Sequence, residues 1–92
     1  MALLDDQEIR DRLDDLDGWT REGDIIRKTY TLDSFPKAID FVNRIAERAE
    51  AANHHPDIDL RYDRVACALS THSEGGLPAR DFDLAVEIDE VR

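Results

Sequence analysis

The segment DSFPKAIDFVNRIAERAEAANHHP, residues 33–56, predicts the longest helix of the chain. Its apolar residues recur every three or four positions, as in a helix that buries one face. They are Phe35, Ala38, Ile39, Val42, Ile45, Ala46, Ala49 and Ala52. Asp33 or Ser34 can cap the start of this helix. The helix must end by His55, because a residue that precedes proline is pushed out of the helical region of backbone conformations.

Before this helix, the sequence predicts a shorter helix and then a β-hairpin. Asp5 and Glu8 can form a capping box at the start of the short helix, and Gly18 is expected to end it. Residues 19–21 and 25–32 flank a Glu-Gly-Asp cluster, which is typical of a hairpin turn. Apolar and polar residues alternate along the second strand, which indicates a sheet that is covered on one face only.

After the long helix, residues 57–61 and 65–72 predict a second hairpin. Alternate residues of a strand point to opposite faces, so its second strand separates larger side chains from smaller ones. The expected faces are Val65, Cys67, Leu69 and Thr71 on one side, and Ala66, Ala68, Ser70 and His72 on the other. A histidine therefore lies at the end of a strip of very small side chains.

The last segment, residues 77–91, fits two patterns. Its apolar residues alternate with acids as in a strand, yet they also fit a helical stripe. Pro78 near the start and the lack of a turn signal over residues 79–92 favour a helix. The expected fold class is α+β: one domain over residues 1–92 in the order αββαββα, with a four-stranded antiparallel sheet and three helices packed on one face.

Composition limits the size and the partners of the protein. Ninety-two residues suffice for one domain, and 41% apolar and 37% charged residues indicate one modest core under a charged surface. The formal net charge of -10 disfavours nucleic acid and membrane surfaces as partners, because both repel an acidic protein. Cys67 is the single cysteine, and no apolar run resembles a membrane span or a signal peptide. A cytoplasmic protein is therefore expected.

All three histidines lie at the ends of predicted elements. His54 and His55 follow the long helix, and His72 ends a strand beside a Ser-Glu-Gly-Gly loop. A rigid element can hold such a side chain while the adjoining loop leaves room for a ligand. Histidines around one pocket can give and take protons near neutral pH, so a dehydration or proton transfer is the natural use. The structural alternative makes His54 a helix cap, His55 a turn residue and His72 an ordinary polar residue at a strand end.

Other chemistries have weaker support. Three histidines could hold zinc, but adjacent residues of extended backbone point to opposite sides, so His54 and His55 cannot easily share a metal. Cys67 is interpreted as a small buried apolar residue rather than a nucleophile. Gly75-Gly76 suits a turn better than a phosphate-binding loop, and Asp81 can be an acid in a first helical turn that the helix dipole explains.

A set of motifs resembles the pterin-4a-carbinolamine dehydratases. The motifs are Glu50-Ala51-Ala52-Asn53-His54-His55-Pro56, Leu69-Ser70-Thr71-His72, Gly75-Gly76-Leu77 and Asp81-Phe82-Asp83-Leu84-Ala85, and the resemblance covers essentially the whole chain. It implies an α+β subunit with three helices on one face of a four-stranded antiparallel sheet, in agreement with the element order above. It also implies a homodimer or homotetramer, and exposed sheet edges offer one way to assemble.

The resemblance implies a lyase that needs no metal and no organic cofactor. Water is eliminated from a 4a-hydroxytetrahydropterin to give quinonoid dihydropterin, which recycles the tetrahydrobiopterin of aromatic amino acid hydroxylases. The residues that match the family's catalytic groups are His54, His55, His72 and Asp81. Those that match its substrate-binding groups are Asn53, Ser70, Thr71 and Glu50, the last of which could orient His54 from one helical turn away.

Two positions depart from the family pattern. Ile58 stands where a Trp is common, so any pocket wall from that Trp must be made differently. Pro78 stands where a Thr often opens the last helix, which preserves a helix start but removes a hydroxyl cap. The alternative function is a non-enzymatic docking module, since some animal members of the family are implicated in stabilising a transcription-factor dimer. Turnover of a carbinolamine pterin by the purified protein discriminates between the two functions.

Overall fold

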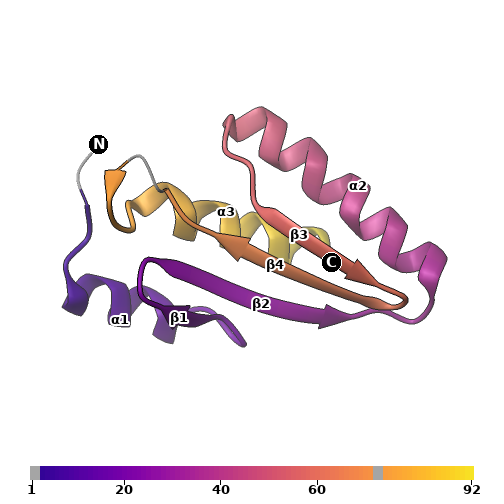
Figure 1. Cartoon of the computed structure of the whole chain (residues 1–92), viewed down its shortest axis with the longest axis horizontal. Helices are drawn as coiled ribbons and strands as arrows, with labels where there is room; N and C mark the ends of the chain where they lie inside the picture. The colour runs from indigo at the N-terminus through magenta and orange to yellow at the C-terminus, as the bar shows by residue number, and fades with distance from the viewer. Residues whose placement is uncertain (1–2, 72–73) are drawn as a thin grey trace.

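The computed structural model describes residues 3–71 and 74–92. Its elements are α1 Asp6–Asp14, β1 Thr20–Glu22, β2 Ile25–Thr31, α2 Phe35–Ala52, β3 Asp57–Arg61, β4 Arg64–Leu69 and α3 Ala79–Val91. This order confirms the predicted fold class, and the ambiguous last segment is a helix. Figure 1 shows α2 and α3 running lengthwise along the strands of an open sheet. Within the described residues, no helix is both long enough and apolar enough to cross a membrane.

The two predicted hairpins join through their inner strands into one antiparallel sheet. The strand order is β1-β2-β4-β3, with Tyr30 of β2 opposite Val65 of β4. Gly23 turns the first hairpin with a φ of 58°, in the left-handed region that glycine adopts without strain. Tyr62 takes a similar φ of 55° in the turn between β3 and β4. The sheet is open, so β1 and β3 are its two edges.

One face of the sheet is buried under the helices. Ile26 and Tyr30 of β2 lie on this face, and so does the predicted apolar face of β4. The opposite face of β4, which carries Ala66, Ala68 and Ser70, is only half-buried. All three helices contribute to the core, through Ile9 of α1, Ala38, Phe41, Ile45 and Ala49 of α2, and Phe82, Leu84, Ala85 and Ile88 of α3.

The buried face of α2 differs from the predicted stripe. Its buried positions are Ala38, Phe41, Ile45 and Ala49, whereas Phe35, Ile39, Ala46 and Ala52 are exposed. Phe41 rather than Phe35 enters the core, where its ring lies 4.8 Å from that of Tyr30, centroid to centroid. Phe35 is 47% exposed. The prediction is wrong here because α2 carries apolar residues over more of its surface than the sheet and α3 cover, and periodicity does not show which part is covered.

The helices before and after the first hairpin, α1 and α2, each begin at a side chain that caps the helix. The backbone N–H of Glu8 donates to Oδ1 of Asp5 at 2.8 Å, and that of Asp5 donates to Oε1 of Glu8 at 3.1 Å, which confirms the predicted capping box. Ser34, rather than Asp33, caps α2 by accepting from the N–H of Lys37 at 3.2 Å. The third helix, α3, follows Pro78 without a side-chain cap, as the loss of a hydroxyl there predicts.

Cys67 is a buried residue on the helix-facing side of β4, as the sequence predicted. Burial, and then the nearby charge of Asp89, raises the pKa of its thiol to about 12. A thiol that stays protonated near neutral pH is a poor nucleophile. The role of Cys67 is therefore packing.

Candidate active site

A sharp turn at the end of α2 places the first two histidines. Asn53, the C-terminal cap, has φ 50° and ψ 43°, a left-handed conformation that Asn tolerates better than most residues. The N–H of Asn53 donates to the carbonyl of Glu50 at 3.1 Å, and that of His54 donates to Ala49 at 3.1 Å. The helix therefore ends before His55, as predicted, and both histidines lie at the junction of α2 and β3.

His54 points inward and meets a carboxylate from another helix. Its Nε2 is hydrogen-bonded to Oδ1 of Asp81, which lies in the first turn of α3. His54 is 8% exposed and Asp81 is 0% exposed. Burying a charge is costly unless it is paired, so an acid that served the helix dipole alone would remain in water. The burial of Asp81 thus favours a role tied to His54 over the dipole explanation.

Thr71 completes a buried polar cluster around Asp81. Its hydroxyl lies 3.0 Å from Oδ2 and 3.2 Å from Oδ1 of the Asp81 carboxylate, and Thr71 is itself buried. Arg80 extends the cluster, because its Nε donates to Oγ1 of Thr71 at 3.4 Å. In the part of the chain that the structure describes, every fully buried side-chain nitrogen or oxygen has a hydrogen-bond partner. The imidazole of His54 and the hydroxyl of Thr71 therefore compensate for the burial of the carboxylate.

A glycine turn holds Thr71 beside the start of α3. Thr71 forms an isolated antiparallel bridge with Gly76, and the N–H of Glu74 donates to the carbonyl of Thr71 at 3.0 Å. Gly75 has a φ of 73°, which a residue with a Cβ adopts only with strain. Gly75 and Gly76 therefore form the turn that the sequence favoured.

His55 forms a second histidine–carboxylate pair, which is open to solvent. Its Nε2 lies 2.5 Å from Oε2 of Glu50, and the two side chains are 60% and 77% exposed. The expected contact between Glu50 and His54 is replaced by this one. The left-handed residue Asn53 ends the helix before His54, so His54 does not lie one turn above Glu50. A polar contact this exposed adds little to stability.

Three predicted site residues, Asn53, Ser70 and His72, lie outside the two histidine–carboxylate pairs or outside the described residues. Asn53 is exposed between the two pairs, and Ser70 is half-buried next to Thr71. His72 lies outside the described residues, so two of the three histidines are placed. The described ranges contain no group of three or more His, Cys, Asp or Glu side chains that could hold a metal ion. Arg80 is the member of the cluster that sequence reasoning missed, and its only signal is its position beside Asp81.

The two pairs give adjacent residues different surroundings. His54 is fixed by a buried carboxylate, while His55 is held by an exposed one. A carboxylate that accepts from Nε2 fixes the orientation and tautomer of an imidazole, and the other ring nitrogen can then exchange a proton. The arrangement suits general acid–base chemistry on a small molecule.

The same fold occurs in solved structures of a pterin dehydratase and of a pterin dehydratase-like protein. A crystal structure from Brucella melitensis, described as a transcriptional coactivator/pterin dehydratase, has a TM-score of 0.93 at 30% sequence identity and covers 98% of both chains. A pterin dehydratase-like protein described as a RuBisCO assembly factor in the alpha-carboxysome has a TM-score of 0.67 at 16% identity. That match covers 79% of this chain and 84% of the other, and shows the fold alone.

Sequence comparison extends the likeness from the fold to the family. The sequence model of the family described as pterin 4 alpha carbinolamine dehydratase matches residues 2–91. A protein of Roseiflexus castenholzii is 61% identical over 90 residues, covering 98% of this chain and 97% of the relative. A protein of Nocardia farcinica is 56% identical over 89 residues, covering 97% and 94%. Both carry the provisional name pterin-4-alpha-carbinolamine dehydratase. The chain belongs to the pterin-4-alpha-carbinolamine dehydratase family.

Proposed function

We propose that the protein is a 4a-hydroxytetrahydrobiopterin dehydratase that acts by histidine general acid–base catalysis. The observation that carries the proposal is the pairing of His54 with the buried carboxylate of Asp81, in a chain that belongs to this family. The reaction breaks the bond between C4a and its hydroxyl group. One proton is delivered to the departing oxygen and another is removed from a ring nitrogen, so water leaves and the quinonoid dihydropterin forms without any change of oxidation state.

His54 and His55 supply two of the proton-transfer groups, and His72 supplies the third. The Asp81 carboxylate accepts from Nε2 of His54, which leaves Nδ1 to exchange a proton with the pterin. Because Asp81 is fully buried, it acts through His54 and is a positioning residue. Glu50 holds His55 in the corresponding way from the solvent side.

Thr71 has a positioning role in this proposal. Its hydroxyl is already committed to the Asp81 carboxylate, and it is buried. Asn53 and Ser70 are the residues better exposed to contact the pterin, since they flank His54 and Thr71 and are less buried. We expect the reaction to need no metal and no organic cofactor, because the C4a–O bond breaks with the help of two proton transfers and no electrons are exchanged with another molecule.

In the cell, a separate reductase would supply two electrons to return the quinonoid dihydropterin to the tetrahydropterin, which an aromatic amino acid hydroxylase would then use again, in the cytoplasm. We propose a homodimer or homotetramer, because β1 and β3 leave two sheet edges that can pair with a second copy. The described residues include no membrane-spanning helix, and the net charge of -10 disfavours nucleic acid.

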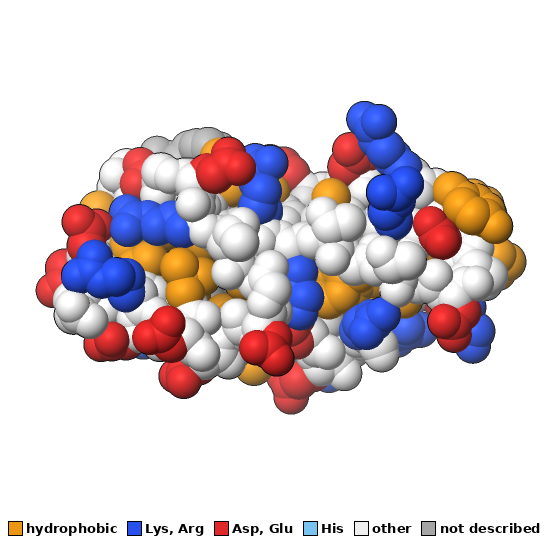
Figure 2. Space-filling model, turned by 90° about the horizontal axis from the view of Figure 1, so that it is seen from below, with side chains coloured by type: hydrophobic (Ala, Val, Ile, Leu, Met, Phe, Trp, Pro, Cys, Tyr) orange, Lys and Arg blue, Asp and Glu red, His pale blue; other side chains and the backbone are white. Residues whose placement is uncertain are grey.

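A second candidate function is a protein-docking module. The observation that favours it is the uncovered apolar surface where α2 begins and β3 turns into β4, at which Phe35, Ile39 and Tyr62 are exposed. Figure 2 shows hydrophobic side chains at the right-hand end of the molecule, where this region lies in Figure 1. The related Brucella melitensis protein is described as a coactivator as well as a dehydratase.

Turnover separates the two candidates. Freshly generated 4a-hydroxytetrahydropterin loses water spontaneously, so the measured quantity is the rate above that background when the purified protein is added. A dehydratase raises the rate in proportion to protein concentration. A docking module leaves it at the background value.

A further inference from the structure

A cavity of about 570 Å³ lies between the first half of α2 and the end of α3. Its lining residues are Leu32, Asp33, Lys37, Arg44, Asp89 and Arg92. Cavities of this volume commonly hold small molecules. Asp81 lies in the first turn of α3 and Asp89 is the nearest cavity residue on that helix, so at about 1.5 Å per residue the cavity begins about 12 Å of helix away from the candidate active site. The cavity is therefore separate from the histidine pairs.

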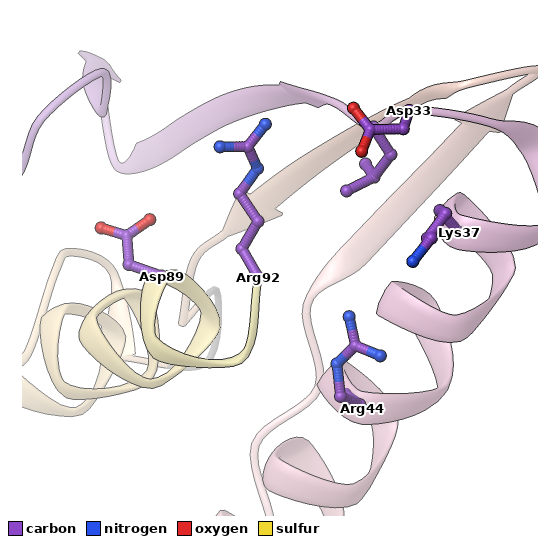
Figure 3. A pocket seen from close by; sticks show the side chains of 6 residues that line it. Asp33, Lys37, Arg44, Asp89 and Arg92 are labelled. Atoms are coloured by element: carbon purple, nitrogen blue, oxygen red, sulfur yellow. The ribbon is translucent and has the colours of Figure 1, made fainter.

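Three cationic side chains share this cavity. Lys37 and Arg44 extend from α2, and Arg92 extends from the end of α3 (Figure 3). None of them forms an ion pair with a carboxylate of the described residues. Such pairs are formed by Arg12, Arg21, Arg27, Lys28, Arg48 and Arg61. In a chain with 22 acidic residues and 12 basic ones, three unpaired bases around one cavity mark a locally positive site.

Two of these cations are held in place without being neutralised. Nε of Arg44 donates to the carbonyl of Val91 at 2.7 Å, and Nη2 of Arg92 donates to the carbonyl of Thr31 at 2.7 Å. A carbonyl anchors a guanidinium group but leaves its positive charge and its other N–H groups available. An anchored side chain also loses less entropy when it binds a ligand.

The two carboxylates of the lining do not cancel this charge. Asp89 already accepts from Nζ of Lys28 at 2.9 Å, from Nε1 of Trp19 at 3.3 Å and from the hydroxyl of Tyr30. The negative charge of Asp89 is thus balanced by Lys28 of β2. Asp33 is exposed, and it is one carboxylate beside three cations.

We propose that this cavity binds a small dianion, whose phosphoryl or carboxylate oxygens contact Arg44, Arg92 and Lys37. Guanidinium groups suit this ligand because they donate parallel N–H bonds to two oxygens of one oxyanion. The site is independent of the proposed dehydratase activity, since none of the predicted catalytic residues lines it.

The test is an NMR titration of the full chain at constant ionic strength, with inorganic phosphate in one arm and succinate in the other. Sodium chloride serves as the reference titration. We expect saturable shifts of the side-chain Nε–H signals of Arg44 and Arg92 and of the backbone N–H of Lys37. The arm with the tighter binding shows whether the site prefers a phosphoryl group or a dicarboxylate.

Matched charge-removing variants test the location. Arg44→Gln should weaken binding about tenfold, because it removes a charge-assisted hydrogen bond. Arg10→Gln removes the same charge from the exposed surface of α1 and should leave the affinity unchanged. The proposal is overturned if neither anion gives saturable shifts at these residues, or if the two variants bind as tightly as each other.

Discussion

His54 and Asp81 lie 27 residues apart in the sequence, yet their side chains meet where α2 ends and α3 begins. The contact joins a buried imidazole to a fully buried carboxylate. Since Asp81 is fully buried, we expect it to act on a substrate through the orientation of His54. Experiments can thus distinguish a side chain that exchanges a proton, such as His54, from one that holds it in place, such as Asp81.

Asp81→Asn should lower kcat about 10- to 100-fold while the protein stays folded. An amide has nearly the same shape, but it lacks the negative charge that stabilises a protonated His54. Steady-state kinetics should show the loss in kcat with little change in KM, which a purely structural role would not produce. Asp83→Asn, on an exposed position of the same helix, is the control and should change neither quantity. A wild-type kcat for Asp81→Asn would refute the positioning role.

Alanine variants of the two adjacent histidines should differ in stability, because one pair is buried and the other is exposed. His54→Ala leaves a buried carboxylate with one partner fewer, which should cost about 1–3 kcal/mol of unfolding free energy. His55→Ala removes an exposed pair and should cost less than about 0.5 kcal/mol. His55→Ala should lower turnover about 100-fold or more, and His54→Ala should lose activity partly through weaker pterin binding. Chemical denaturation measures the difference, and equal losses of stability would count against the buried role of His54.

The sequence predicts features whose signals are local, and it misses pairings that depend on packing. The capping box of Asp5 and Glu8 lies within one helical turn, so its residues identify it. The partner of His54 depends on how the end of α2 packs against α3, which no short motif contains. The partner of Glu50 depends on one backbone conformation, the left-handed Asn53.

The same distinction explains the error in α2. The 3.6-residue period identifies the helix and its apolar character correctly. Which part of that apolar surface is buried depends on the sheet and on α3, and these cover Phe41 and leave Phe35 exposed. The motif resemblance supplies the site residues that periodicity could not, but not their hydrogen-bond partners.

The protein should lose stability as the pH rises above about 9. Burial raises the pKa of Cys67 from 9.0 to about 12, and burial with the hydrogen bond to Asp89 raises the pKa of Tyr30 above 10.0. Both groups stay neutral in the folded state at pH values where the unfolded chain ionises. The stability they contribute is therefore complete below pH 9 and is lost progressively above it.

Denaturant titrations from about pH 8 to pH 11 measure this loss. Cys67→Ala should make the decline shallower, because one of the two groups is gone. The same slope in the variant and the wild type would show that Cys67 does not contribute.

Light scattering at micromolar concentration should give the mass of a dimer or a tetramer. If the β3 edge takes part, Ile58→Lys should shift the protein towards the monomer, because a lysine on an edge strand disfavours pairing with another strand. Val86→Lys adds the same charge at an exposed apolar position of α3 and should leave the mass unchanged. A strictly monomeric wild-type protein would rule out the proposed assembly.

The central claim is tested most directly by the rate at which chelator-treated protein dehydrates freshly generated 4a-hydroxytetrahydropterin. We predict a rate well above the spontaneous one, reduced about 10²- to 10⁴-fold in His55→Ala and His72→Ala, and unchanged in Asn43→Ala, an exposed control on α2. His54→Ala should lower the rate partly through weaker pterin binding, which steady-state kinetics separates from turnover. A spontaneous rate with wild-type protein, activity restored only by zinc, or near wild-type rates in all three histidine variants would contradict the account.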